Sequence, residues 1–254
     1  MASEADYRLP RTVIPKHYSL TLEPNLEGGT FAGSVVIDVE VAEATDAVVL
    51  NAIDLDIEAA SVIDGDGEQA ATWSLDEESQ RLTLTLKSGL VEGPAAVRIS
   101  FRGVLNDMLR GFYRSTYVDA DGNEKTLATT QFEATDARRA FPCWDEPDLK
   151  ATFSVNLITD PGLMAVSNAA EASRETLDNG KVKVCFAPTV RMSTYLVAFI
   201  VGDLEATEPV DVDGVPLRII TPPGKLHLTD FAIEAGAHSL RYFADYYDVP
   251  YPGD

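Results

Sequence analysis

Hydrophobic residues recur at every second position through much of the chain, and this spacing constrains the fold more than any other feature. Because successive side chains of a β-strand point to opposite faces, the pattern predicts strands with one buried and one solvated face. The stretches that show it are 18–22, 35–41, 53–57, 82–86, 97–101, 153–157 and 182–186. Residues that tolerate positive φ predict hairpin turns at 28–29, 64–67 and 121–123. The sequence therefore predicts a mainly β fold of antiparallel sheets.

The pattern changes towards the C-terminus. Residues 195–201 are apolar on both faces, which predicts a strand that is covered on both sides. An acidic stretch rich in turn residues follows at 203–214. We place a domain boundary there, so the expected domains are 1–203 and 204–254.

One helix is predicted at 229–247, where apolar residues are spaced three and four apart. The stripe that they form consists of Ile233, Gly236, Leu240, Phe243 and Tyr247. Thr229 is the predicted N-cap, and two prolines after the stripe are expected to end the helix. Little chain remains to cover the stripe. We therefore expect the sequence to stop within a domain, with Leu240 and Phe243 more exposed than in an intact protein.

The formal charge of −21 and the pI near 4.4 argue against nucleic-acid binding, because binding to phosphates requires a basic patch. The same charge disfavours an anionic membrane surface. No apolar run approaches the ~20 residues of a membrane span, and the first ten residues lack the apolar core of a signal peptide. These observations predict a cytoplasmic protein with no nucleic-acid or membrane partner.

The two cysteines, Cys143 and Cys185, have no CxxC spacing, so neither a disulfide scaffold nor a zinc knuckle is predicted. We expect both to be free, buried thiols. The three histidines, His17, His227 and His238, show no pattern that would pair with a Cys143 nucleophile.

Residues 129–147 read TTQFEATDARRAFPCWDEP, which is typical of neither a strand nor a helix. Charged residues of both signs stand between aromatic residues, and Pro142 and Pro147 restrict the backbone. The stretch predicts a shaped loop of polar groups on a β scaffold, a common place for binding residues. The alternative is a structural corner in which an arginine of the stretch pairs with one of its carboxylates.

This stretch resembles the signature of the N-terminal domain of M1-family zinc aminopeptidases, the gluzincins related to aminopeptidase N. Further motifs resemble the family in the same order: FRGVLNDMLRGFYRSTY (101–117), STYLVAFIVGDLE (193–205), TPPGK (221–225) and DYYDVPYP (245–252). The resemblance implies a saddle-like antiparallel β-sandwich domain at 1–203. It also implies that 204–254 is the short strand-plus-helix start of an α/β thermolysin-like catalytic domain.

The family removes one residue from the free N-terminus of a peptide, with zinc held by an HExxH helix and a later Glu, and with a GxMEN segment in the site. This chain contains neither HExxH nor GxMEN. We therefore expect zinc in the full-length enzyme, no metal bound by this chain, and no activity of the chain without the missing catalytic domain. The alternative is a non-catalytic β-sandwich module that binds peptides or proteins. An HExxH downstream of the chain would decide for the enzyme.

Three residues match the substrate-binding positions of the family. The resemblance implies that Glu133 binds the α-ammonium group of the peptide, that Gln131 lines the first specificity pocket, and that Ala134 follows a cis peptide bond. The physics agrees, because a carboxylate in a partly desolvated cleft pairs strongly with a cation. The alternative for Glu133 is a solvated surface carboxylate.

The remaining residues of the stretch are expected to build the loop. Arg139 is expected to form an ion pair with Asp145 or Glu146. Trp144 and Phe141 are expected to be buried in the core.

Overall fold

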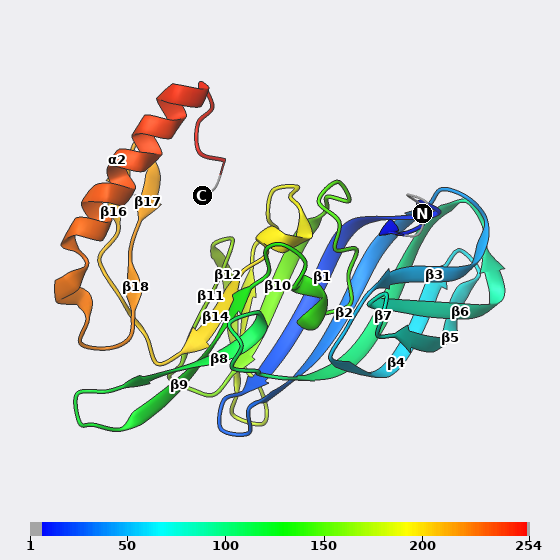
Figure 1. The fold of residues 1–254 in the computed structure, drawn as a ribbon, viewed down its shortest axis with the longest axis horizontal. Helices are drawn as coiled ribbons and strands as arrows, with labels where there is room; N and C mark the ends of the chain where they lie inside the picture. The colour runs from blue at the N-terminus through cyan, green and yellow to red at the C-terminus, as the bar shows by residue number, and fades with distance from the viewer. Residues whose placement is uncertain (1–6, 253–254) are drawn as a thin grey trace.

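The computed structural model describes residues 7–252 and shows a long, curved β structure with one α-helix at one end of the molecule (Figure 1). Its largest element is a ten-stranded sheet. In spatial order its strands are β12 (Glu171–Thr176), β13 (Val182–Phe186), β10 (Thr152–Thr159), β1 (Val13–Asn25), β2 (Thr30–Val41), β7 (Gly93–Val104), β4 (Leu55–Asp64), β5 (Gly67–Asp76), β6 (Arg81–Leu90) and β3 (Thr45–Asn51).

A second sheet has four strands and carries the signature stretch at the end of one of them. Its spatial order is β11 (Met164–Ser167), β14 (Phe199–Gly202), β9 (Glu124–Gln131) and β8 (Gly111–Val118). The two sheets pack through aromatic rings, since the ring of Phe112 on β8 lies 5.1 Å from that of Phe31 on β2. Within the four-stranded sheet, the Phe112 ring also lies 4.9 Å from that of Phe199 on β14.

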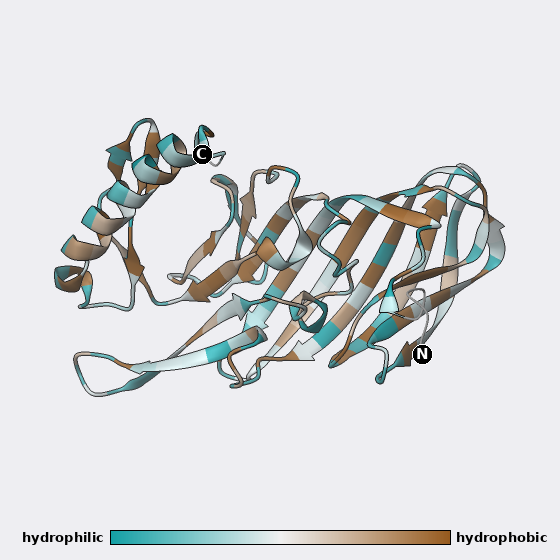
Figure 2. Cartoon of the chain, turned by 45° about the horizontal axis from the view of Figure 1, so that its top comes forward, coloured by the Kyte–Doolittle hydropathy of each residue, from teal (hydrophilic) through white to brown (hydrophobic). Residues whose placement is uncertain are grey.

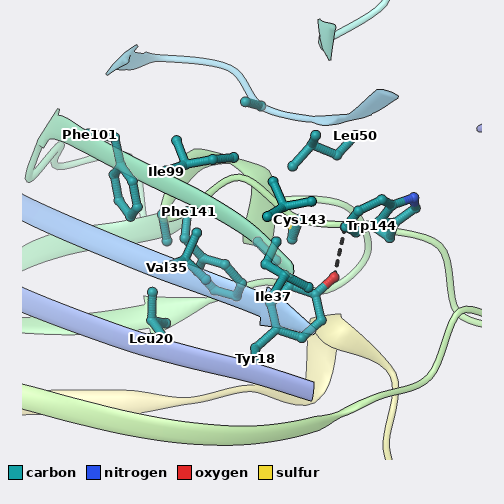
Figure 3. Close-up of a cluster of buried hydrophobic side chains, with 14 of the residues drawn as sticks. Tyr18, Leu20, Val35, Ile37, Leu50, Ile99, Phe101, Phe141, Cys143 and Trp144 are labelled. Carbon is teal, nitrogen blue, oxygen red and sulfur yellow. Dashed lines mark hydrogen bonds between the residues drawn. The ribbon is translucent and has the colours of Figure 1, made fainter. Parts of the chain in front are cut away.

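The large sheet also folds back on itself to form a sandwich. The first half of β5 pairs with β4 and its second half pairs with β6, so the sheet turns a corner within this strand. As a result, Leu50 on β3 points into the same buried cluster as Ile37 on β2 and Ile99 on β7 (Figure 3). The expectation of a mainly β fold with antiparallel sheets and a helix near the C-terminus is confirmed.

The burial of alternate residues explains why these segments form strands. Tyr18, Leu20 and Leu22 on β1 are fully buried, while the residues between them face outward. Hydrophobic and hydrophilic residues alternate along several strands of the large sheet (Figure 2). The hairpin turns at 28–29, 64–67 and 121–123 lie where they were expected, between β1 and β2, β4 and β5, and β8 and β9.

Three local predictions differ from the structure. The pairing of β1 with β10 is parallel, because β10 enters the sheet after the long signature loop and not through a hairpin. Ile53 lies in the connection between β3 and β4, where Asp54 adopts a left-handed φ of 59°. Residues 195–201 do not form one covered strand. A 3-10 helix, η2 (Thr194–Leu196), precedes β14, and Leu196 is exposed.

The C-terminal part begins with two short antiparallel pairings. β15 (Glu205–Ala206) pairs with β18 (Ile220–Thr221), and β16 (Val210–Val212) pairs with β17 (Val215–Leu217). A 3-10 turn, η3 (Leu226–Leu228), leads into the helix.

The helix α2 spans Asp230–Tyr247, close to the predicted range. Thr229 stands at the N-cap position, but its side chain does not cap the helix. Its hydroxyl donates instead to the carbonyl oxygen of Leu226 at 2.7 Å. The helix ends before the prolines, because Asp248 adopts the left-handed conformation that closes many helices.

The apolar stripe of α2 is only partly covered within the described residues. Leu217 on β17 lies against Gly236, where an added β-carbon would come within 3.1 Å of Leu217 Cδ2. Phe243 and Tyr247 are 51% and 64% exposed. Within residues 7–252, no helix is both long enough and apolar enough to cross a bilayer.

Candidate recognition loop

The strand β9 delivers Gln131, Glu133 and Ala134 to one exposed tip. β9 ends at Gln131, and the chain then turns, with the amide of Asp136 donating to the carbonyl oxygen of Phe132 at 2.8 Å. The Gln131 side chain donates from Nε2 to the carbonyl oxygen of Glu133 at 3.5 Å. The peptide bond between Glu133 and Ala134 is cis, as the resemblance implied. The structure thus brings all three expected residues together, with exposed side chains.

Phe132 fixes the base of this tip. Its side chain is 2% exposed, and its ring lies 6.1 Å from that of Phe141 and 5.8 Å from that of Phe199. Because Phe132 is buried between two exposed residues, Gln131 and Glu133 are held on the solvent side of the loop.

Arg139 joins the loop to the connection that follows β3. Its Nε donates to Asp136 Oδ1 at 2.7 Å, and its second ion pair is with Asp54. The amide of Ile53 donates to the carbonyl oxygen of Arg138 at 3.1 Å, so the backbone makes the same connection. Two segments far apart in the sequence therefore support the tip.

The buried ion pair of the stretch is between Arg138 and Asp145, so the expectation that Arg139 pairs with Asp145 or Glu146 is wrong. Arg138 Nε donates to Asp145 Oδ2 at 2.9 Å, and the two side chains are 11% and 1% exposed. The reason is the 3-10 helix η1 (Ala137–Arg139), in which about three residues make one turn and adjacent side chains point in different directions. Arg138 therefore faces the interior and Arg139 faces Asp136.

Burial raises the pKa of the Asp145 carboxyl above its usual value, and the hydrogen bond from Arg138 opposes this rise. The backbone of the same residue is also satisfied, since the Asp145 amide donates to Asn51 Oδ1 at 3.2 Å.

Glu146 connects the stretch to the beginning of the described chain. Its carboxylate accepts a hydrogen bond from the amide of Leu9 and pairs with Arg11 at 2.7 Å and Arg8 at 3.5 Å. Sequence reasoning did not identify this contact, because nothing in the spacing of residues 8–11 indicates a partner in the signature stretch.

Phe141, Cys143 and Trp144 lie fully buried beneath the loop, as expected for the two aromatic residues (Figure 3). Burial raises the pKa of the Cys143 thiol well above its usual value, so the thiol stays neutral and is a poor nucleophile. Cys185 is also free but only partly buried, which corrects the expectation of two buried thiols.

The charge pairing singles out Glu133. The acidic residues of 129–147 are Glu133, Asp136, Asp145 and Glu146. The last three have cationic partners, whereas Glu133 makes no ion pair with any residue in the range 7–252. The loop thus presents one exposed, unpaired carboxylate on a support whose other charges are compensated.

Comparison of the sequence with known proteins identifies the family of the chain. The family model described as the Peptidase M1 N-terminal domain matches residues 14–196. The chain belongs to the peptidase M1 family. Its M1 relatives include the alanine/arginine aminopeptidase of Saccharomyces cerevisiae, which is 43% identical over 96% of this chain and 28% of that protein. Aminopeptidase M1 of Arabidopsis thaliana is 41% identical over 96% of the chain and 28% of that protein.

Endoplasmic reticulum aminopeptidase 1 of Homo sapiens is 36% identical over 96% of this chain and 27% of that protein. The chain therefore spans about a quarter of the length of the M1 relatives it matches.

The described part of this M1 chain does not fit a catalytic zinc ion. Among residues 7–252, no group of three or more His, Cys, Asp or Glu side chains is arranged to hold a metal. Of the histidines, His17 is engaged with Thr152, whose hydroxyl lies 2.7 Å from its Nδ1.

Proposed function

We propose that the full-length protein containing this chain is a zinc-dependent aminopeptidase and that this chain recognises the free amino terminus of its peptide substrates. The observation that carries the proposal is the unpaired, exposed carboxylate of Glu133 on a loop whose other carboxylates are compensated. The relatives named above support it, since each is an aminopeptidase.

In this proposal Glu133 forms an ion pair with the α-ammonium group of the peptide. Such a charge-assisted pair is stronger where water is partly excluded, as in a cleft between this domain and a facing one. Gln131, one residue before the buried Phe132, would line the pocket for the first side chain, and Ala134 would border it. Because the ammonium is held at one fixed place, the first peptide bond is presented at a constant distance from Glu133.

We also propose that residues 1–203 are the recognition domain and that 204–254 begin the catalytic domain. The family match ends at residue 196, close to that boundary. The ligands for zinc would come from residues outside this sequence, because the chain contains no HExxH. The chain alone should therefore bind no stoichiometric zinc and hydrolyse no amino-acid p-nitroanilide. One tightly bound zinc per chain in elemental analysis would contradict this.

The experiment that tests the role of Glu133 uses the full-length protein. Glu133→Gln should lower kcat/KM for peptides with a free amino terminus by about 10- to 150-fold, which corresponds to the ~1.5–3 kcal/mol of a hydrogen bond to a charged group. The control is Glu92→Gln, which removes an exposed carboxylate from the connection between β6 and β7.

An unchanged kcat/KM in Glu133→Gln would remove this residue from the site. A full-length protein without HExxH and without activity would instead be a non-catalytic peptide- or protein-binding module.

A further inference from the structure

A pair of apolar side chains is exposed at the end of the β8–β9 hairpin that carries the candidate recognition loop, residues 132–139. Met108 and Leu109 form the tip of the connection between β7 and β8 and are 54% and 64% exposed. An adjacent pair of exposed apolar side chains offers an apolar contact surface to a binding partner.

The connection is a shaped loop that presents the pair in one place. The Asn106 side chain fills its centre: Oδ1 accepts from the amide of Met108 at 2.8 Å, and Nδ2 donates to the carbonyl oxygen of Arg110 at 2.9 Å. On the inner side, Leu105 is 1% exposed and its amide donates to the carbonyl oxygen of Gly29 at 2.9 Å. The backbone that carries Met108 and Leu109 is therefore held at both ends.

The connection ends next to the candidate recognition loop. Gly111, which ends it, pairs in register with Gln131, and neighbouring strands lie about 5 Å apart. A β-carbon added to Gly111 would lie 2.8 Å from Cβ of Arg139. The 105–110 connection and the 132–139 loop thus leave the β8–β9 hairpin at the same end, and Gly111 at the start of β8 lies against Arg139.

We propose that Met108 and Leu109 form the apolar wall of the pocket that receives the side chain of the first substrate residue. This inference rests on the proposed function. If Glu133 holds the ammonium group, the first side chain starts from the neighbouring carbon atom, and Gln131 and the strand beside it lie within its reach. Gln131 supplies a polar surface, whereas Met108 and Leu109 supply the apolar surface that a leucine or phenylalanine side chain requires. A flexible methionine allows side chains of several shapes to be accepted.

The test measures the kcat/KM of the full-length protein for alanine, leucine and phenylalanine p-nitroanilides. The variants are Met108→Ser, Leu109→Ser and the double variant. We expect the values for the leucine and phenylalanine substrates to fall about tenfold or more, and the value for the alanine substrate to change by less than about twofold, because lost apolar contact affects only the large side chains. Val118→Ser is the matched control, since Val118 is 63% exposed at the other end of β8.

The comparison of substrates separates the possible results. Glu133→Gln should lower kcat/KM for all three substrates by the same factor, so that the ratio of the leucine and phenylalanine values to the alanine value stays unchanged. An unchanged ratio in the Met108 and Leu109 variants would overturn the inference while leaving the proposed function intact. A lower melting temperature together with an unchanged ratio would show that the pair packs against another part of the protein, and would also overturn it. A wild-type protein that cleaves none of the substrates would overturn both proposals.

Discussion

The hydroxyl of Tyr18 accepts a hydrogen bond from the backbone amide of Trp144 at 3.0 Å, across 126 positions of sequence (Figure 3). Both side chains are fully buried. The carbonyl oxygen of Trp144 accepts in turn from Thr194 Oγ1 at 2.8 Å. Two side chains thus satisfy the backbone of Trp144, and that of Tyr18 connects β1 to the stretch that bears the candidate recognition loop.

Tyr18→Phe should lower the free energy of unfolding by about 1–3 kcal/mol, because it leaves the buried amide of Trp144 without a partner. Urea unfolding measures the change. The matched control is Tyr117→Phe, in which the lost partner is the carbonyl oxygen of Asp203 near the surface. Water can replace that hydroxyl, so we expect a change within about 0.5 kcal/mol. If both variants lost the same free energy of unfolding, burial of the unpaired backbone group would not be the cause of the loss in Tyr18→Phe.

Alkaline pH should destabilise the fold through Tyr18 and Cys143. Burial raises the pKa of both groups in the folded state, so the folded protein retains protons that the unfolded chain releases. Their contribution to stability is complete below the unfolded pKa values of about 8.5 for Cys and about 10 for Tyr, and it decreases as the pH rises above them. Between these two pH values, urea unfolding should show that the free energy of unfolding declines less with pH in Cys143→Ala than in the wild-type chain. An identical decline in both proteins would exclude the thiol as its cause.

The strands were predictable because their signal is local, as the buried and outward residues of β1 show. Pairing between distant segments was not predictable. The parallel contact of β1 with β10 follows from how the chain returns after the signature loop, and no turn residue records it. The position of α2 was predictable from its apolar stripe, but the hydrogen bond of Thr229 was not. The Thr229 hydroxyl can either accept from an amide of the first helical turn or donate to the carbonyl oxygen of Leu226, and the sequence does not show which.

The candidate site was found through resemblance and gained its physical meaning from the structure. The sequence shows four carboxylates in 129–147 without showing which are compensated. The cationic partner of Asp145 depends on the turn of η1, and those of Glu146 lie at residues 8 and 11. Only when these pairs are known does Glu133 emerge as the unpaired one.

Arg138→Leu should destabilise the fold by about 3–5 kcal/mol at neutral pH, because it leaves the carboxylate of Asp145 buried without a counter-ion. Acid should reduce the loss. Without Arg138, the pKa of Asp145 rises further, and protonation removes the buried charge. The control is Arg98→Leu, which breaks a half-exposed pair with Glu68 and should cost less than about 1 kcal/mol. Unfolding in urea at neutral and mildly acidic pH measures both. A loss in Arg138→Leu that does not depend on pH would contradict the argument.

Two phenylalanines pack over two glycines between β2 and β7. Phe31 pairs with Gly103, and two residues along the strands the order is reversed, so that Gly33 pairs with Phe101. A β-carbon on Gly103 would lie 2.2 Å from Cζ of Phe31, and one on Gly33 would lie 2.5 Å from Cε2 of Phe101. Each ring thus occupies the space that a side chain on the opposite strand would need.

Gly103→Ala should therefore destabilise the fold by about 1–3 kcal/mol, the cost of overpacking a core. The Phe31 ring cannot move aside easily, because it is buried and packed edge-on against Phe112. Gly65→Ala is the control, since an added β-carbon there meets nothing within 4 Å. A double-mutant cycle with Phe31→Leu tests the cause, because alanine at 103 should cost less when the ring is absent. Strictly additive losses in urea unfolding would show that the cost arises elsewhere than in the contact between this ring and position 103.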